Sequence, residues 1–257
     1  MNKIKLGCYD DLAKSYSKFR PSYSNDAIQF LKILVNNKRN QCLDIGAGTG
    51  IFSRKLTEIF KKVYAVEISK SMIREGKKIK NKKIIWINSS AEKIKLKKKT
   101  FNLVTSASCF HWLDNKKIAK KIVPFMEKNS YFFIIYNSRN RNFNKFSKLV
   151  EKKLGYLDPS FLKKRVSSGQ SPKTLIKIKK FAKINKFTQP LTFNLKHTEN
   201  FSKKKYIGAW ISSNEVRARL GDKKFKIFID WLNNKLKPND TVTTEYINTC
   251  FILQKNY

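Results

Sequence analysis

Residues that build metal centres and disulfide frameworks are scarce in this sequence. Its 257 residues include two histidines and four cysteines. The cysteines, at positions 8, 42, 109 and 250, form no CxxC pair and show no zinc-ligand spacing. We therefore expect no metal site and no disulfide framework, and unpaired cysteines favour a reducing compartment, the cytoplasm.

Long apolar segments are absent as well. The longest uninterrupted apolar run, residues 131–136, is far shorter than the roughly 20 residues that span a bilayer. Leu6-Gly7-Cys8 superficially resembles a lipoprotein cleavage site, but no apolar stretch precedes it. The sequence thus predicts a cytoplasmic protein without a membrane partner.

Acidic residues are few, since 18 Asp and Glu stand against 56 Lys and Arg, and the formal net charge is +38. Only nine of the basic residues are arginines, whose planar fork suits phosphates and base edges. The rest are lysines spread along the chain, as an AT-rich genome would impose through its codons. Because net charge governs solubility and nonspecific association more than specific activity, we expect nucleic acid to bind only nonspecifically.

Apolar residues, in contrast, make up 41% of the chain, and 19 of the residues are phenylalanines. This composition is typical of a globular protein with a sizeable core. Apolar strands are expected at residues 41–45, 63–66, 84–87, 101–106 and 131–136, and helices at 26–35, 51–60, 69–78 and 116–126. Such alternation indicates a parallel sheet covered by helices on both faces.

The pattern changes after residue 137. A Lys-rich, helix-like stretch at residues 142–186 predicts a helical lid, followed by a possible strand at 187–195. Helices are expected at about 203–211 and 222–236, and a final strand at 241–253. We therefore interpret the chain as a single domain, with a core over 1–140, a lid and acceptor-site elaboration with one strand over 141–235, and a last strand over 236–257.

The motif Asp44-Ile45-Gly46-Ala47-Gly48-Thr49-Gly50 lies where the first strand passes into a helix. Glycines here let the backbone turn sharply and approach a ligand closely. A dinucleotide fingerprint needs another glycine at the next position, where this chain has Ile51. Asp44 instead suits a ligand with an ammonium group, and Glu67, at the end of the second strand, can accept both hydroxyls of a ribose.

These residues make the chain resemble a class I S-adenosylmethionine-dependent methyltransferase of the type-11 family, which includes trans-aconitate-methyltransferase-like enzymes. The likeness covers roughly residues 9–140. It implies a Rossmann-like α/β fold: a mainly parallel seven-stranded sheet with helices on both faces, an antiparallel last strand and a helical lid. The cofactor implied is S-adenosyl-L-methionine, held by Asp44, Gly46, Ala47, Gly48, Gly50, Glu67, Ile68, Ser90, Ala91, Glu92, Ser106, Tyr16 and Arg20.

Five of these residues are assigned from two other family segments rather than from the glycine motif. Tyr16 and Arg20 match the family's N-terminal flap over the cofactor carboxylate. Ser90-Ala91-Glu92 matches a run beside the adenine that usually begins with Asp. Here the serine hydroxyl would accept from the adenine amino group, without charge assistance.

His111 and Trp112 match a His-Trp pair that follows the fourth strand in the family. His111 either has a role in catalysis, in which it orients the acceptor or takes its proton, or serves only as a structural hydrogen-bonding partner. Trp112, Tyr23 and Trp210 are candidate acceptor-binding residues, although Trp112 is equally compatible with packing under the lid. Cys109 is interpreted as a small buried residue, because it lacks the Pro-Cys motif of cytosine-methylating enzymes.

Three functions follow from these residues. The first is methyl transfer to a small-molecule acceptor by in-line displacement, where positioning and desolvation carry catalysis. The second is RNA or DNA modification, which the charge favours. The Asn/Asp-Pro-Pro-aromatic motif of amino-directed nucleobase enzymes is missing, however, and residues 106–109 occupy its place. The third is a non-catalytic binding protein, which the intact Asp44, glycines and Glu67 argue against. The acceptor and the oligomeric state do not follow from the sequence.

Overall fold

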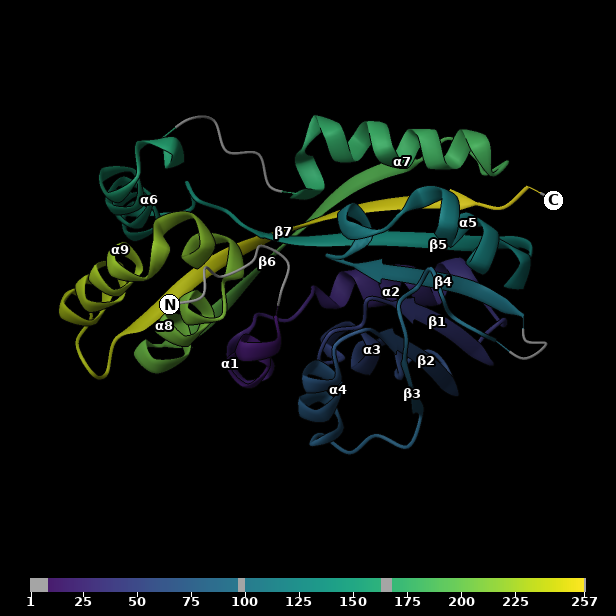
Figure 1. The fold of residues 1–257 in the computed structure, drawn as a ribbon, viewed down its shortest axis with the longest axis horizontal. Coiled ribbons are helices and arrows are strands. Elements are labelled where there is room, and N and C mark those ends of the chain that lie inside the picture. The colour runs from purple at the N-terminus through teal and green to yellow at the C-terminus, as the bar shows by residue number, and fades with distance from the viewer. Residues whose placement is uncertain (1–8, 97–99, 163–167, 257) are drawn as a thin grey trace. The chain divides into compact units, whose positions relative to one another are not determined.

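A computed structural model describes residues 9–96, 100–162 and 168–256 (Figure 1). The strands are β1 (Gln41–Ile45), β2 (Lys62–Glu67), β3 (Ile84–Asn88), β4 (Phe101–Ala107), β5 (Met126–Arg139), β6 (Leu191–Ser202) and β7 (Thr241–Gln254). The α-helices are α1 (Ala13–Phe19), α2 (Asn25–Val35), α3 (Ile51–Leu56), α4 (Lys70–Lys77), α5 (Asn115–Ile122), α6 (Lys145–Leu157), α7 (Pro172–Ile184), α8 (Lys203–Ile211) and α9 (Asn214–Lys235). Within these ranges, no helix has the length and apolarity needed to cross a membrane.

The seven strands form one sheet in the order β3-β2-β1-β4-β5-β7-β6. The strands from β1 to β5 pair in parallel. β7 runs antiparallel to β5. The Asn129 N–H donates to the Lys255 carbonyl at one end of this pair, and the Asn140 N–H donates to the Glu245 carbonyl at the other. The predicted Rossmann-like sheet with an antiparallel last strand is therefore confirmed.

Side-chain alternation along β5 explains why helices cover both faces of this sheet. Phe132, Ile134 and Tyr136 belong to a core that also contains buried residues of α5 and α7. Phe133 and Ile135 belong to a second core, formed with α2 and α3. Successive strand residues point to opposite faces, so an unbroken apolar strand needs a helical layer on each. Figure 1 shows these two pairs of helices on opposite sides of β5.

The chain divides into two compact units, and the division falls within β5, β6 and β7. Unit 2 comprises residues 22–138, 167–195 and 247–257 and contains the parallel strands. Unit 1 comprises residues 1–21, 139–166 and 196–246 and has its own core, contributed mainly by α6, α8 and α9. The predicted boundary after residue 140 lies close to the division after Ser138, whereas the single-domain interpretation stays a prediction.

Two elements differ from the sequence-based expectation. The sixth strand covers 191–202 rather than 187–195, because Pro190 lacks the N–H that a strand interior needs. Phe187 instead forms an isolated bridge with Lys255. The helix expected at 222–236 is the second part of α9, which begins at Asn214. Gly221, with φ 69° and ψ 166°, kinks α9 between its two parts.

Two isoleucines of α2 should contribute very differently to the free energy of unfolding. Ile28 is 1% exposed and Ile33 is 79% exposed. We expect Ile28→Ala to lower the free energy of unfolding by about 2–5 kcal/mol, because it removes apolar contacts and leaves a cavity. Ile33→Ala, the matched control, should change it by less than about 0.5 kcal/mol. Urea denaturation measures both, and equal losses would contradict the placement of this helix.

Candidate functional site

The candidate site lies in unit 2, where parallel strands end at their carboxyl edge. β1 ends at Ile45 and passes through the glycine loop, residues 46–50, into α3. Ala47 donates its N–H to the carbonyl of Val66 at 3.0 Å, which ties the loop to the end of β2. This edge of an open α/β sheet is where such folds bind their ligands.

Backbone conformation explains the glycines of this loop. Gly46 and Gly48 have φ of 68° and 58°, in the left-handed region that disfavours other residues. A Cβ on Gly46 would also lie 2.1 Å from the Cys109 sulfur, whereas one on Gly48 would meet no atom within 4 Å. Gly46 is therefore required by packing as well as by conformation, and the space beside Gly48 is open.

Glu67 holds the loop from the neighbouring strand. Its Oε2 accepts a hydrogen bond from the Gly48 N–H at 2.8 Å, and its Oε1 accepts one from the Ser69 N–H at 2.9 Å. Each carboxylate oxygen has two lone pairs, so each keeps one for a ligand hydroxyl. The neighbouring Ile68 is 69% exposed, and its assignment to the cofactor stays a prediction.

Asp44 is fully buried, and two hydroxyls occupy its carboxylate. Ser53 of α3 donates to Oδ2 at 2.6 Å, and Thr105 of β4 donates to Oδ1 at 2.7 Å. Burial raises the pKa of Asp44 to about 6, the two hydroxyls lower it, and the nearby Glu67 raises it again. Asp44 thus joins β1, β4 and α3 in this structure. Its contact with a ligand ammonium group stays a prediction.

The segment after β3 borders the same edge. Ser90 and Glu92 are half-buried, and Ala91 is buried. Glu92 accepts a hydrogen bond from the Asp114 N–H at 3.2 Å, which connects this segment to the one that follows β4. The Ser90 carbonyl accepts the Lys93 N–H at 3.1 Å. The adenine contacts assigned to this run stay a prediction.

His111 and Trp112 lie in a short 3-10 helix, Phe110–Trp112, directly after β4. The His111 ring packs against Trp112 and Tyr136, with ring centres 4.6 Å and 5.6 Å away. Trp112 is 48% exposed, so much of its indole is available to a ligand. Lys177 of α7 donates to the carbonyls of His111 and Leu113 and holds this segment in place.

The remaining assigned residues of unit 2 pack around the end of β4. Ser106 is fully buried, and Cys109 is half-buried. Burial, with smaller contributions from the Glu67, Asp44 and Glu92 carboxylates, raises the pKa of Cys109 to about 12, so its thiol is protonated at neutral pH and is a poor nucleophile. The Tyr23 hydroxyl donates to the Ser108 hydroxyl at 3.1 Å.

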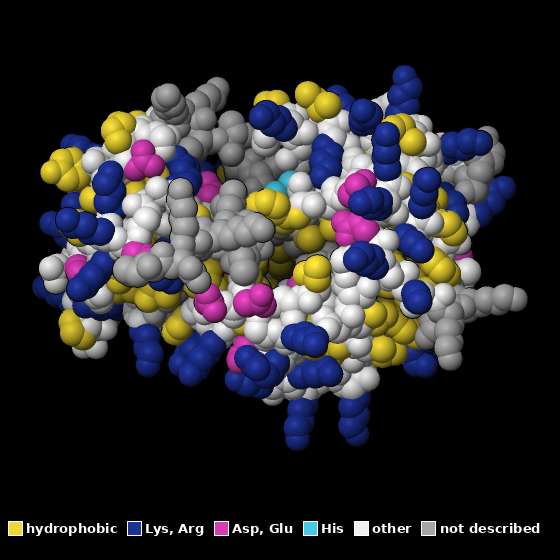
Figure 2. Space-filling model, viewed as in Figure 1, with side chains coloured by type: hydrophobic (Ala, Val, Ile, Leu, Met, Phe, Trp, Pro, Cys, Tyr) yellow, Lys and Arg dark blue, Asp and Glu magenta, His cyan; other side chains and the backbone are white. Residues whose placement is uncertain are grey.

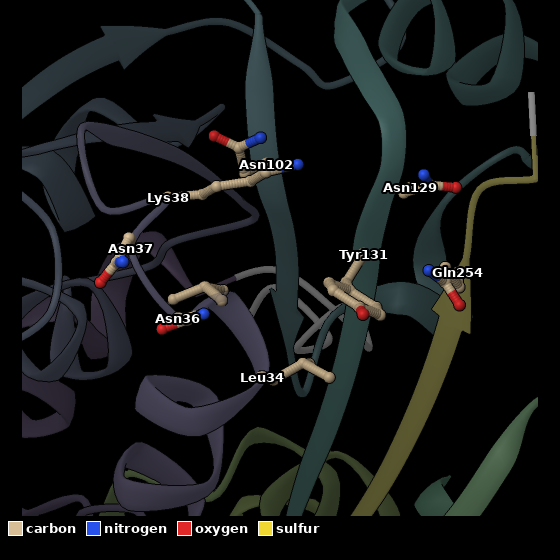
Figure 3. Close-up of a pocket in the computed structure, with 9 residues that line it drawn as sticks. Leu34, Asn36, Asn37, Lys38, Asn102, Asn129, Tyr131 and Gln254 are labelled. Atoms are coloured by element: carbon tan, nitrogen blue, oxygen red, sulfur yellow. The ribbon is translucent and has the colours of Figure 1, made fainter.

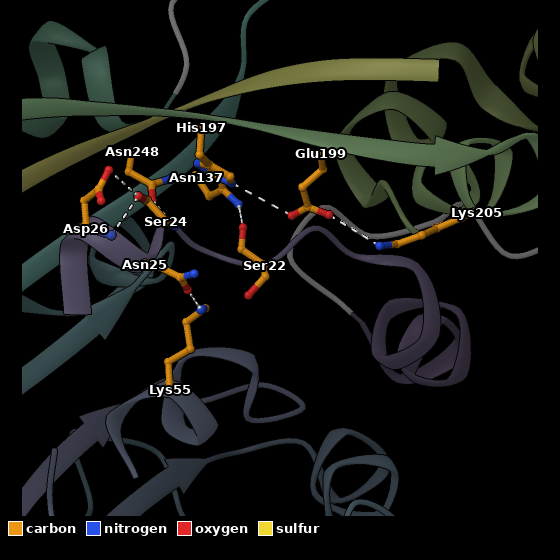
Figure 4. A network of polar contacts seen from close by, with 10 residues as sticks. All are labelled: Ser22, Ser24, Asn25, Asp26, Lys55, Asn137, His197, Glu199, Lys205 and Asn248. Carbon is orange, nitrogen blue, oxygen red and sulfur yellow. Dashed lines mark hydrogen bonds and ion pairs between the residues drawn. The ribbon is translucent and has the colours of Figure 1, made fainter. Parts of the chain in front are cut away.

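The side-chain amides of Asn137 and Asn248 anchor the segment that carries Tyr23 (Figure 4). Asn248 of β7 accepts the Ser24 N–H at 2.7 Å and donates to Asn137 of β5 at 2.8 Å. Asn137 in turn donates to the Ser22 carbonyl at 2.6 Å. Ser24 also caps α2, because its hydroxyl accepts the Asp26 N–H.

Tyr16, Arg20 and Trp210 belong to unit 1. The Arg20 guanidinium lies 4.9 Å from the centre of the Tyr16 ring. Trp210 is 2% exposed and forms part of the core of unit 1. Their assignment to cofactor and acceptor stays a prediction.

A polar pocket of about 430 Å³ lies elsewhere in unit 2 (Figure 3). It is lined by the end of α2 at Val35, by Asn102 near the start of β4, by Tyr131 of β5 and by Gln254 of β7. The glycine loop and His111 follow the opposite, carboxyl ends of these parallel strands. The pocket is therefore separate from the candidate site.

The positive charge does not gather into one stripe on the face that Figure 2 shows. Lys and Arg side chains are scattered there among polar and apolar ones. A specific nucleic-acid surface would concentrate them. In the described part of the chain, no three His, Cys, Asp or Glu side chains are placed to hold a metal ion.

Comparison with known proteins relates the part of the chain that carries this site to one family. Residues 43–134 match the methyltransferase domain family. A protein of Dictyostelium discoideum named as a methyltransferase is 34% identical over 106 residues, which is 41% of this chain and 40% of the relative. One of Schizosaccharomyces pombe is 29% identical over 142 residues, 53% of this chain and 56% of the relative. The chain thus spans about half the length of the curated relatives it matches.

Solved structures show the same fold over most of the chain. A protein of Anaeromyxobacter dehalogenans described as a type II methyltransferase has a TM-score of 0.62 at 17% identity and covers 91% of this chain and 97% of its own. Phosphoethanolamine N-methyltransferase 2 of Haemonchus contortus, in complex with phosphomonomethylethanolamine and S-adenosylhomocysteine, has a TM-score of 0.53 at 18% identity, covering 96% and 58%. Residues 43–134 are thus similar to methyltransferase domains, and the chain shares the fold of these solved structures.

The raised pKa of Asp44 predicts a pH-dependent stability. The folded chain binds this proton more tightly than the unfolded chain, so ionisation of Asp44 disfavours folding as pH rises. Between pH 4.5 and 7 this group should lower the free energy of unfolding by about 2 kcal/mol. Urea denaturation of Asp44→Asn at both pH values isolates the effect: the variant, relative to the unmodified protein, should gain stability by about that amount at the higher pH. A constant difference would show that Asp44 is ionised throughout.

Proposed function

We propose that this protein binds S-adenosyl-L-methionine and transfers its methyl group. The observation that carries the proposal is Glu67, whose two oxygens each accept one backbone N–H from the loop and its own turn while keeping a lone pair for a ribose hydroxyl. The space beside Gly48 lets the ligand approach the backbone. The exposed Ile68 and the Ser90-Ala91-Glu92 run then provide the surroundings of an adenine.

We further propose a small molecule as the methyl acceptor. A lone pair of the acceptor attacks the methyl carbon, the carbon–sulfur bond breaks, and its electron pair stays on the sulfur, which becomes a neutral thioether. The acceptor then loses a proton, and His111 is the candidate base, because an imidazole is partly neutral at physiological pH. Trp112 offers an exposed ring to the acceptor beside it. On the face that Figure 2 shows, the positive charge is scattered, which favours a small acceptor over a nucleic acid.

The ribose contacts predict the effect of changing Glu67. We expect Glu67→Ala to weaken the binding of S-adenosylhomocysteine by about 1.5–3 kcal/mol, since hydrogen bonds to a charged group are lost. Glu58→Ala, an exposed glutamate in the same unit, is the matched control and should bind as the unmodified protein does. Isothermal titration calorimetry measures all three proteins. If the unmodified protein binds NAD more tightly than this ligand, the proposed cofactor is wrong.

The placement of His111 predicts a separation between activity and stability. His111→Ala should lower methyl transfer from radiolabelled donor by about a hundredfold, while donor affinity and melting temperature stay unchanged. The exposed Lys116→Ala, on the helix that follows, should keep full activity. The acceptor for this assay comes from a screen of small-molecule pools with the same donor. A melting temperature that falls together with the activity would assign His111 a structural role instead.

A further inference from the structure

A lysine of α7 binds the backbone of the segment that carries His111. The Lys177 ammonium group donates to the carbonyl of His111 at 3.1 Å and also to the carbonyl of Leu113. One of these two residues precedes Trp112 in the chain and the other follows it. All four lie in unit 2. A single side chain thus fixes the backbone on both sides of the exposed indole.

The turn that receives these hydrogen bonds is a three-residue 3-10 helix. Its own backbone bonds run from the Trp112 N–H to the Cys109 carbonyl at 2.9 Å and from the Leu113 N–H to the Phe110 carbonyl at 3.2 Å. A helix leaves its last carbonyls without partners inside the helix, and cationic side chains stabilise that end. Lys177 therefore supplies donors that this end of the turn needs.

Contacts other than the ammonium group also hold α7 against this turn. The Asn115 side-chain amide donates to the Lys177 carbonyl at 2.9 Å. The rings of Phe110 and Phe181 are both buried and meet edge to face, with centres 5.5 Å apart. Ile178, the next residue of the helix, is fully buried as well. Loss of the ammonium group should therefore release the two carbonyls while the helix stays packed.

The charge of Lys177 has an energetic cost that packing does not require. The side chain is half-buried, and its Nζ lies 5.9 Å from the centre of the Phe110 ring. Burial lowers the pKa of the Lys177 ammonium group, and the charge of Asp114 makes the largest opposing contribution. A methionine would fill the same space without this desolvation cost. The carbonyls that the cation binds, rather than packing, therefore explain its presence.

We propose that Lys177 is a positioning residue for methyl transfer: its ammonium group fixes the turn at residues 110–112, so that the His111 imidazole and the Trp112 indole are held in place for the methyl acceptor. This role rests on the proposed function of the same site. Lys177 acts through the backbone of the turn rather than on the reacting atoms. Because a displacement of about 1 Å at a reacting centre can cost about a hundredfold in rate, loss of these two hydrogen bonds should lower turnover.

The test compares Lys177→Met with Lys180→Met. Methionine keeps a flexible apolar side chain and removes the donors and the charge. Lys180 is the matched control, because it is exposed on the next turn of α7. Each variant lowers the net charge of +38 by one, so a general electrostatic effect on an anionic ligand is the same in both. Lys177→Gln, which keeps one amide donor, is a second variant for the case that Lys177→Met does not fold.

The first readout needs no methyl acceptor. The chain has four tryptophans, so labelling with 5-fluorotryptophan gives one fluorine NMR resonance for each, and Trp112→Phe assigns that of Trp112. We expect this resonance to shift or broaden in Lys177→Met, because the backbone of the turn is no longer fixed, and to stay unchanged in Lys180→Met. Lys177→Gln should show a smaller change. An unchanged Trp112 resonance in the folded Lys177 variants would overturn the proposal.

The second readout is methyl transfer to the acceptor found in the screen. Lys177→Met should lower kcat about tenfold or more, while the affinity for S-adenosylhomocysteine stays unchanged and the melting temperature stays within a few degrees of the unmodified protein. Lys180→Met should keep full activity.

Three results would contradict a positioning role: equal losses of kcat in Lys177→Met and Lys180→Met, a shifted resonance with unchanged kcat, or an affinity for S-adenosylhomocysteine that falls together with kcat. A different result identifies failure of the proposed function. In that case the unmodified protein transfers no methyl group to any acceptor, whatever the Trp112 resonance shows.

Discussion

The buried carboxylate of Asp44 is the interaction on which the candidate site depends. It accepts hydroxyl hydrogen bonds from Ser53 and Thr105, so one side chain joins β1, α3 and β4 at the point where the glycine loop begins. A buried carboxylate is costly unless its oxygens are satisfied, and here two donors of neighbouring elements satisfy them. Hydrogen bonds to the sheet and to α3 therefore fix the position at which the glycine loop begins.

Glu67 holds the same loop through the Gly48 N–H, and it is slightly more exposed than Asp44. Asp44 is fully buried, whereas Glu67 is 9% exposed and ends a strand at the open edge of the sheet. Asp44 thus joins elements within the fold, whereas Glu67 lies where the proposed cofactor would bind. The segment after β4 is positioned in a similar way, because Glu92 and Lys177 bind its backbone and leave the rings of His111 and Trp112 for other contacts.

Unit 1 follows another physical rule. Its core is apolar and aromatic, and the Arg139 guanidinium lies 3.6 Å from the centre of the Trp210 ring of that core. Packing alone does not favour this arrangement, since a neutral side chain would fill the same space at lower electrostatic cost.

Much of the fold and part of the site followed from the sequence by itself. Strand and helix positions up to residue 136 depend on local apolar periodicity, and Gly46 to Gly50 with Glu67 depend on spacing along a strand, turn and helix. Tertiary structure alone decided the hydroxyl partners of Asp44 and the support of the His111 backbone by Lys177. The contacts of Thr105 with Asp44 and of Lys177 with His111 join residues 61 and 66 positions apart in the chain. No local pattern encodes which distant side chain completes such a hydrogen bond.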